Sequence, residues 1–259
     1  MKLFTKLALL ALPILAACGG GGSSDETCAS NLGTLTKSCT SNVSTAIPEG
    51  IWYGATTTEL AAQTIVLENG QYFSVYTSNS TGAFQWLTEG FMTASNGTIT
   101  DTATIALTNT NAIISGSASG SFTAKSSLAM TTTMNTVPNT TVLSYNGAYN
   151  SIYDSALNIS DVSGATWTSP ATLATVSTIT FQADGSASGK QGTCTFTGSF
   201  KPRSTGKHLL DGTLNFTSAT CLAGNGVSMP VEATVVNSQL TLVGVTPQRN
   251  AAFYLTARR

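Results

Sequence analysis

The chain has 259 residues, of which 41% are hydrophobic and 9% are charged, and its formal net charge is −1. This combination excludes an intrinsically disordered chain, which needs low hydrophobicity and high net charge. The balance of 11 basic and 12 acidic residues excludes the basic surface of a nucleic-acid-binding protein. The 44 threonines and 30 serines favour strands and turns over long helices, so we expect an all-β fold.

Residues 1–17 have the parts of a secretory signal peptide. Lys2 and Lys6 form a basic start, and the apolar run over residues 7–15 is too short to span a bilayer. Residues 15–18, Leu-Ala-Ala-Cys, resemble the lipobox of bacterial lipoproteins. In that family the signal is cut before the cysteine, which then carries a diacylglycerol and a fatty acyl chain such as palmitate. The resemblance implies that Cys18 is the lipid-anchored first residue of the mature chain.

Residues 18–47 are expected to hold this cysteine, a tether and a small disulfide loop. Residues 19–26 carry no apolar side chain and cannot pack, which predicts a flexible tether. In enteric lipoproteins an aspartate directly after the lipidated cysteine favours retention in the inner membrane, whereas this chain has Gly19 there. The resemblance therefore implies an anchor in the outer membrane. Both a periplasmic and a cell-surface location agree with it.

Four further cysteines in a chain with an export signal predict two disulfide bonds. Cys28 and Cys39 are close in sequence, as are Cys194 and Cys221, and of the three possible pairings we expect these two local ones. We expect no zinc site, because the spacings contain no Cys-x-x-Cys and the single histidine, His208, is not next to a cysteine pair.

The body of the chain has a hydrophobic pattern with a period of two. Cys194, Phe196 and Phe200, for example, fall on one face of a segment whose other face carries hydroxyl groups. Asn-Gly or Asp-Gly dipeptides at 69–70, 96–97, 146–147 and 184–185 are typical of tight hairpin turns. The pattern and the turns together predict antiparallel sheets with one polar face.

Each half of the body contains about eight strand candidates. Those of the first half begin near Trp52, Ile65, Tyr72, Gln85, Thr98, Ala112, Ser121 and Leu128. Those of the second begin near Ala165, Val176, Ser186, Thr193, His208, Val227, Gln239 and Ala251. Eight strands fit a small closed antiparallel barrel, which has no free edges, and a pair of open sandwiches is the alternative. We expect lobes over residues 48–140 and 141–259, with the boundary in the turn-rich segment 135–163.

Two similar segments indicate an internal repeat. Trp52 and Trp167 open the two halves, and Gly70 and Gly185 end similar hairpin strands; both pairs are 115 residues apart. Farther along, Glu89-Gly90-Phe91 aligns with Thr197-Gly198-Ser199 at an offset of 108 residues.

The start of the body, Gly50-Ile51-Trp52, its hairpins and its ending over residues 250–255 resemble uncharacterised proteobacterial envelope lipoproteins. The ending is also similar to the small barrels of transferrin-binding-protein-type surface lipoproteins. The resemblance covers residues 48–259. It implies a β-barrel architecture and an outer-membrane location, and it transfers no functional residue.

The sequence contains no recognisable catalytic or cofactor-binding motif. His208 is the only imidazole and Asp211 follows it, but there is no Gly-x-Ser-x-Gly elbow to present a serine nucleophile. The acidic residues of the body are scattered, and its glycine-rich stretches lack the lysine and hydroxyl of a phosphate-binding loop. We therefore expect no catalytic residue, no cofactor and no metal, and a protein that is not an enzyme.

Aromatic residues gather in the first half. Tyr72, Ser74 and Tyr76 share one face of a predicted strand, and Phe73 and Val75 share the other. One face is expected to fill the core. The other is either ordinary sheet surface or an exposed patch that binds a protein or a glycan.

These observations favour a lipid-anchored envelope protein with a non-enzymatic binding or structural role, whose protein or glycan partner the sequence does not identify. The alternative is a lipocalin-like carrier of a small apolar ligand, which requires an apolar cavity of about 300 Å³ or more in one barrel. A third hypothesis, an envelope hydrolase, has to use His208 or a pair of carboxylates.

Overall fold

The computed structural model describes residues 26–29, 38–41, 46–169 and 176–259, so the predicted signal peptide and Cys18 lie outside the described residues. The chain divides into two units, Met1–Val43 and Ser44–Arg259. In the first unit, β1 (Glu26–Ala29) pairs antiparallel with β2 (Ser38–Ser41), and the register sets Cys28 opposite Cys39. The Cys28–Cys39 disulfide itself stays a prediction.

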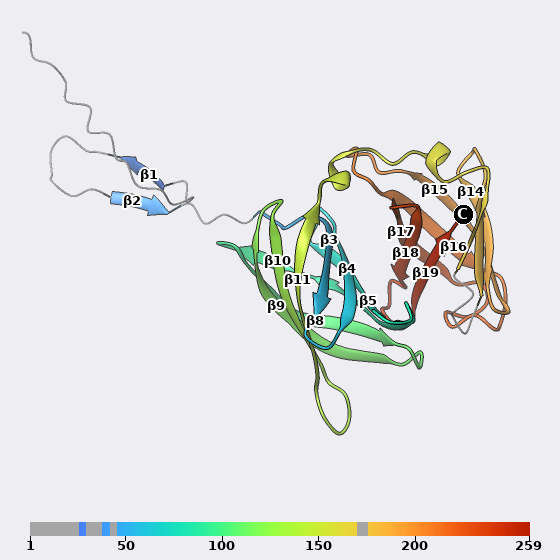
Figure 1. Ribbon diagram of the computed structural model, residues 1–259, viewed down its shortest axis with the longest axis horizontal. Helices are drawn as coiled ribbons and strands as arrows, with labels where there is room; N and C mark the ends of the chain where they lie inside the picture. The colour runs from blue at the N-terminus through green and yellow to red at the C-terminus, as the bar shows by residue number, and fades with distance from the viewer. Residues whose placement is uncertain (1–25, 30–37, 42–45, 170–175) are drawn as a thin grey trace, which may run out of the picture. The chain divides into compact units, whose positions relative to one another are not determined.

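The second unit begins with an up-and-down ring of antiparallel strands, seen at the centre of Figure 1. Consecutive strands pair around the ring, the short β7 continues β6 along β8, and β11 returns to pair with β3, which closes the barrel. The strands are β3 (Gly50–Thr56), β4 (Leu60–Val66), β5 (Gln71–Ser78), β6 (Phe84–Phe91), β7 (Thr93–Ser95), β8 (Thr98–Thr108), β9 (Ile113–Thr123), β10 (Ser127–Met134) and β11 (Thr141–Asn150).

A second closed antiparallel barrel follows, with the same up-and-down order. It closes where Thr168 of its first strand lies opposite Arg258 of its last. The strands are β12 (Thr166–Thr168), β13 (Ser177–Phe181), β14 (Ser186–Gln191), β15 (Cys194–Pro202), β16 (Leu210–Phe216), β17 (Ser228–Val236), β18 (Gln239–Val245) and β19 (Ala252–Arg258). The prediction of an all-β chain with two tandem barrels is confirmed, in preference to open sandwiches.

The first barrel extends to Asn150, because β11 has to pair with both β10 and β3 to close it. The predicted start of the second lobe at residue 141 therefore falls inside this closing strand. Two short 3₁₀ turns, η1 (Ser151–Asp154) and η2 (Ile159–Asp161), join the barrels. The predicted strands near Ala112 and Ser121 are one strand, β9.

The break predicted within β9 falls next to Gly120, directly before Ser121. The structure explains this glycine by close strand packing: a Cβ on Gly120 would lie 2.0 Å from the carbonyl oxygen of Ala129 on β10. Glycine is needed there because the neighbouring backbone approaches too closely for any side chain.

Two different cores fill the barrels. The first barrel encloses a polar network in which the Tyr72 hydroxyl donates to Asp101 at 3.0 Å and lies 2.8 Å from the Thr104 hydroxyl. The second is filled by packed aromatic rings, with Phe253 centred 5.3 Å from Phe196 and 5.7 Å from Phe216. Both interiors are therefore occupied by side chains.

The predicted repeat has a structural counterpart in the first hairpin of each barrel. Gly70 and Gly185 both have positive φ, +86° and +83°, and each amide donates to the residue three positions earlier. The carbonyl of Gly70 accepts from the amide of Met92, and that of Gly185 accepts from the amide of Phe200. Met92 and Phe200 are 108 residues apart, so the second offset in the sequence also has a counterpart in the structure.

The barrels pack together through an apolar layer. The outward side chains of β3–β6, including Phe73 and Val75, are buried there against side chains of β17–β19 such as Val243 and Val245. Phe73 and Val75 therefore do not form an exposed patch, and that alternative is wrong for this strand. The sequence pattern showed two apolar faces but not that the second one is covered by the other barrel.

Three ion pairs join the barrels beside this layer, each between a glutamate of the first barrel and a basic residue of the second. They are Glu68–Arg203 at 2.8 Å, Glu89–Arg249 at 2.8 Å and Glu49–Lys207 at 3.0 Å. Glu89 is only 2% exposed. Apolar packing and paired charges thus hold the two barrels in one arrangement.

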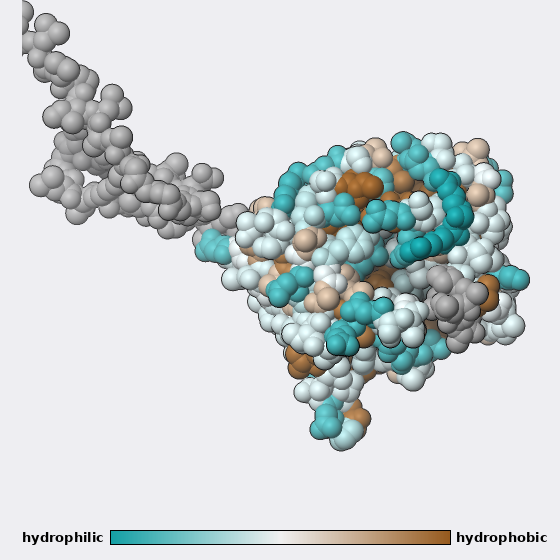
Figure 2. Space-filling view, in the orientation of Figure 1, coloured by the Kyte–Doolittle hydropathy of each residue, from teal (hydrophilic) through white to brown (hydrophobic). Residues whose placement is uncertain are grey.

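The outer surface is rich in hydroxyl groups. Threonines pair across neighbouring strands, as in Thr166–Thr180 at 2.8 Å and Thr195–Thr217 at 2.9 Å. Most of the surface in Figure 2 is pale, the colour of residues of intermediate hydropathy such as serine and threonine. Cross-strand hydroxyl pairs of this kind stabilise an exposed sheet.

Candidate ligand-binding pocket

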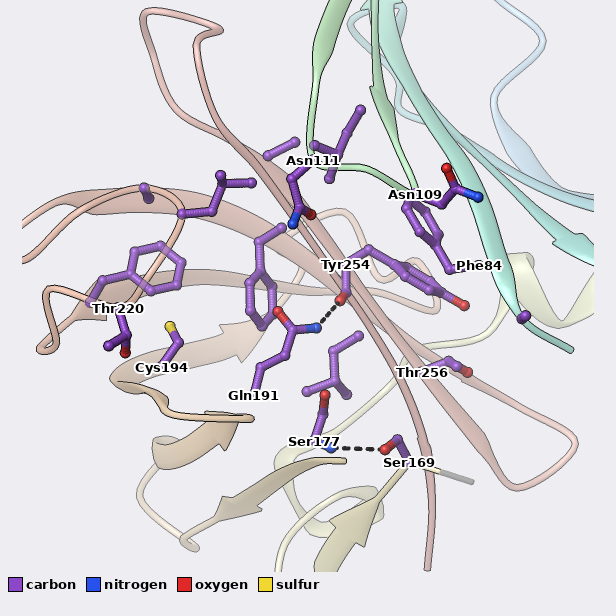
Figure 3. Close-up of a pocket in the computed structure, with 18 residues that line it drawn as sticks. Phe84, Asn109, Asn111, Ser169, Ser177, Gln191, Cys194, Thr220, Tyr254 and Thr256 are labelled. Atoms are coloured by element: carbon purple, nitrogen blue, oxygen red, sulfur yellow. Dashed lines mark hydrogen bonds between the residues drawn. The ribbon is translucent and has the colours of Figure 1, made fainter. Parts of the chain in front are cut away.

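A pocket of about 460 Å³ lies at one mouth of the second barrel. The second barrel supplies most of its wall, through β13, β14, β19 and the β16–β17 loop. The first barrel supplies Phe84, at the start of β6, and Asn109 and Asn111, in the β8–β9 turn. Figure 3 shows Thr220 and Cys194 on one side of the pocket and Phe84, Asn109 and Thr256 on the other.

Within the described residues, the pocket lies beside the edge of β19 where its pairing with β12 is short. β12 has three residues and meets β19 at a single register position, Thr168 opposite Arg258. Nearer the start of β19, a side chain bonds to the backbone of this edge within the described residues: the side-chain amide of Gln191 donates to the Tyr254 carbonyl at 3.0 Å. The side chain of Gln191 thus takes the place of a ladder hydrogen bond at the seam.

Apolar side chains line the part of the pocket nearest the barrel interior. Phe216, Phe253 and Leu255 project from the core, and Leu222 reaches in from the β16–β17 loop. Leu222 is 52% exposed, so its side chain is available for contact with a molecule in the pocket.

The predicted Cys194–Cys221 disulfide is confirmed, and it forms part of this wall. The bond joins the first residue of β15 to the β16–β17 loop, directly before Leu222. The Cys221 amide also donates to the Ser218 carbonyl at 3.1 Å. The loop that carries Leu222 is therefore held at the barrel mouth by a covalent bond.

The opposite part of the pocket carries neutral hydrogen-bonding groups. Asn111 has a φ of +64°, which asparagine tolerates better than most residues, and its backbone amide donates to the Thr108 carbonyl at 3.0 Å. Phe84 and Tyr254 stack across the junction of the barrels with ring centres 4.9 Å apart. Burial raises the pKa of Tyr254 to about 12, so its hydroxyl is neutral at physiological pH.

The lining residues that the structure describes include no aspartate, glutamate, lysine, arginine or histidine. Cys194 is held in the disulfide and does not titrate. The described wall therefore presents apolar groups, hydroxyls and carboxamides to whatever enters. Sequence patterns did not reveal Asn109, Asn111 or Gln191; the two asparagines of Asn109-Thr110-Asn111 are a turn signal, but nothing local connects them with β19.

His208 lies away from this pocket, in a buried position between η1 and β17. Its Nε2 is 2.9 Å from the Val235 carbonyl and its Nδ1 is 3.2 Å from the Ser155 hydroxyl, while its own carbonyl accepts from Thr234. Ser155 in turn donates to the Ile152 carbonyl at 2.7 Å. These contacts fix the end of η1 on the second barrel, a structural role.

Asp211 does not join His208. It belongs to a cluster in which the Arg203 guanidinium lies 2.7 Å from Asp211, 2.8 Å from Glu68 and 3.2 Å from Glu232. One cation thus faces three carboxyl groups. Of these, Glu232 is the one that burial shifts toward the protonated form. Burial, reinforced by the nearby Asp211, raises the pKa of Glu232 to about 8 despite Arg203. A Ser-His-Asp arrangement built from His208 and Asp211 is therefore not assembled.

Among the described residues, no cluster of three or more histidine, cysteine, aspartate or glutamate side chains has a geometry suited to a metal ion. In the same part of the chain, no helix has the length and apolar character needed to cross a membrane. In comparisons with known proteins, no family model, no curated sequence and no solved structure matches this chain.

Proposed function

We propose that this chain is a lipid-anchored envelope protein that binds a small molecule, without chemical conversion, in the pocket between its two barrels. The observation that carries the proposal is the pocket itself. Its volume of about 460 Å³ lies in the range of known small-molecule sites, which are mostly apolar with a few polar groups. The lining has this composition.

The surroundings of the pocket favour binding because its walls are held in place before a ligand arrives. The disulfide fixes the β16–β17 loop, and the inter-barrel layer and the Glu89–Arg249 pair fix the first barrel against the second. A preformed wall reduces the conformational entropy lost on binding, so more of the contact energy contributes to affinity.

The composition of the wall supports binding rather than catalysis. General acid–base chemistry needs a group that gains or loses a proton near neutral pH, and the lining carries neutral carboxamides, hydroxyls and a tyrosine with a pKa of about 12. The carrier hypothesis is altered in one respect: aromatic side chains fill the interior of the second barrel, and the proposed site lies at its mouth.

The anchor is the second part of the proposal and rests on the lipobox-like residues 15–18. Replacing Cys18 by serine is expected to release the protein from membranes, because a multiply acylated cysteine is the proposed attachment. Protease treatment of intact cells, followed by blotting, distinguishes a cell-surface from a periplasmic location. Membrane association that persists in Cys18→Ser would contradict the lipid anchor.

A titration with N-phenyl-1-naphthylamine tests the binding site. This uncharged aromatic amine becomes fluorescent in apolar surroundings, and the purified mature chain with Cys18→Ser is expected to bind it saturably, one molecule per chain. Leu222→Ser is expected to weaken binding about fivefold, since part of one leucine contact, about 1 kcal/mol, is lost.

Val142→Ser is the matched control, because Val142 is 50% exposed, on β11, and does not line the pocket. Its affinity for the probe is expected to equal that of the unsubstituted chain. Fluorescence that rises without saturating, or an equal loss in both variants, would refute the proposed site.

A further inference from the structure

One hydroxyl group of the pocket is buried without a hydrogen bond of normal geometry to any of the described residues. Thr256, on β19, is 9% exposed, and its Oγ1 makes no hydrogen bond of normal geometry within the described residues. The neighbouring Tyr254 hydroxyl is close enough for Thr256 to offset slightly the burial that raises the pKa of Tyr254. A buried hydroxyl without a partner destabilises a folded protein, so such a group calls for an explanation.

The position of Thr256 in the pocket offers an explanation for its unpaired hydroxyl. It lies on the side of the pocket that also holds Phe84 and Asn109, across from the disulfide-linked loop (Figure 3). Gln191 lies between the two sides; its Nε2 donates to Tyr254, which leaves Oε1 as an acceptor. Thr256 thus offers a hydroxyl group, and Gln191 a carboxamide oxygen, to a polar ligand group in the pocket.

The absence of charged side chains among the lining residues restricts the ligand. A carboxylate or ammonium group entering this pocket would lose water without gaining a counter-ion, which is strongly unfavourable. A hydroxyl or carboxamide would exchange its hydrogen bonds with water for bonds to Thr256 and Gln191 at little net cost.

We propose that the pocket takes an uncharged amphipathic molecule, whose apolar chain lies against Phe216, Phe253 and Leu222 and whose hydroxyl or carboxamide head group bonds to Thr256. This inference rests on the proposed function, because it names the ligand class of the same site. Leu222 supplies the contact for the apolar end and Thr256 the contact for the polar end. The two ends can therefore be tested separately.

Displacement of N-phenyl-1-naphthylamine by three eight-carbon compounds tests the charge requirement. Octanamide, octanoate and octylammonium share a chain and differ in the head group, which is neutral, negative or positive at pH 7.4. Octanamide is expected to bind at least tenfold more tightly than either ion. Equal or tighter binding of octanoate or octylammonium would overturn the inference.

Thr256→Val tests the head-group contact with a side chain of the same shape. The variant is expected to bind octanamide about tenfold more weakly, as for loss of one hydrogen bond, while its melting temperature without ligand rises because an unpaired buried hydroxyl is gone. Thr132→Val is the control, since the Thr132 hydroxyl is also buried and unpaired within the described residues but lies in the first barrel. It is expected to leave octanamide binding unchanged.

The outcomes separate the two proposals. Failure of the naphthylamine to bind saturably refutes the pocket as a binding site. Saturable binding of the naphthylamine with no preference for octanamide, or with unchanged octanamide affinity in Thr256→Val, refutes only the ligand class and the role of Thr256.

Discussion

Replacing Cys194 and Cys221 by alanine removes the bond that holds the β16–β17 loop at the mouth of the second barrel. The two cysteines are 27 residues apart. In the chain-entropy description, a disulfide that closes a loop of this length lowers the conformational entropy of the unfolded chain. At 25 °C this contributes about 3.5 kcal/mol to the free energy of unfolding. We expect the double variant to lose about this much of its free energy of unfolding.

Equilibrium unfolding in guanidinium chloride measures this loss. Trp52 and Trp167 are fully buried, one in each barrel, so tryptophan fluorescence reports on both. In a Trp52→Phe background the signal from the second barrel is weighted more strongly. Because the barrels share an apolar layer, we expect them to unfold together and the midpoint to fall in both backgrounds.

The matched control is the double variant Cys28→Ala/Cys39→Ala, whose cysteines lie in the other unit of the chain. It is expected to leave the unfolding of the barrels unchanged. A loss below about 1 kcal/mol in Cys194→Ala/Cys221→Ala, with an unchanged denaturant slope, would refute the loop-closure reasoning. The same variant is expected to bind N-phenyl-1-naphthylamine more weakly, since Leu222 follows Cys221 directly.

Three further predictions concern polar groups that sequence patterns did not connect. Arg249→Met leaves the buried Glu89 without its cation and is expected to lower the free energy of unfolding by about 3–5 kcal/mol, whereas Arg249→Met combined with Glu89→Gln should recover most of it in denaturant titrations. Equal losses in the single and double variants would contradict this. Gly90→Ala is expected to destabilise the first barrel by about 1–3 kcal/mol, because its Cβ would lie 1.9 Å from the Asp101 carboxylate that accepts from Tyr72; an unchanged melting temperature would refute it. Finally, Glu232 has a pKa of about 8 in the folded chain, so the folded state keeps a proton that the unfolded chain releases above about pH 4.5. The contribution of protonated Glu232 to the free energy of unfolding is therefore lost as the pH rises towards 8. Between pH 4.5 and 8 the melting temperature is expected to fall less steeply with pH in Glu232→Gln than in the unsubstituted chain. Identical slopes would contradict the raised pKa of Glu232.

Local chemistry made the strands and hairpins predictable. Alternation along a strand and an Asn-Gly or Asp-Gly turn involve residues only a few positions apart, so most of them can be recognised without knowing the fold. The turn predicted at Asn146-Gly147 is wrong, because both residues lie within β11 and pair with β3 and β10. All eight strands of the second barrel begin within two residues of their predicted starts. The local Cys194–Cys221 pairing follows from the hairpin of β15 and β16, which returns the chain to the start of β15.

The errors in the first barrel come from contacts between strands. Gly120 stands directly before the strand start wrongly predicted at Ser121, and it is present because the Ala129 backbone lies against it. No strand was predicted over Thr141–Asn150, and these residues fell in the predicted second lobe, because the partner strand β3 lies about 90 residues away and no pattern within the segment identifies it. Closure of a ring is a property of the whole sheet.

The sequence by itself predicted an all-β chain with two tandem lobes, either barrels or sandwiches, and favoured the local Cys194–Cys221 pairing; it also predicted an export signal with a lipobox-like end. Only the tertiary structure decided what the second apolar face of β5 packs against and where a ligand could bind. The stacked pair of Phe84 and Tyr254 and the ion pair of Glu89 and Arg249 each join residues at least 160 positions apart. Such contacts depend on how the two folded barrels pack against each other. Side-chain periodicity within a strand carries no information about that packing.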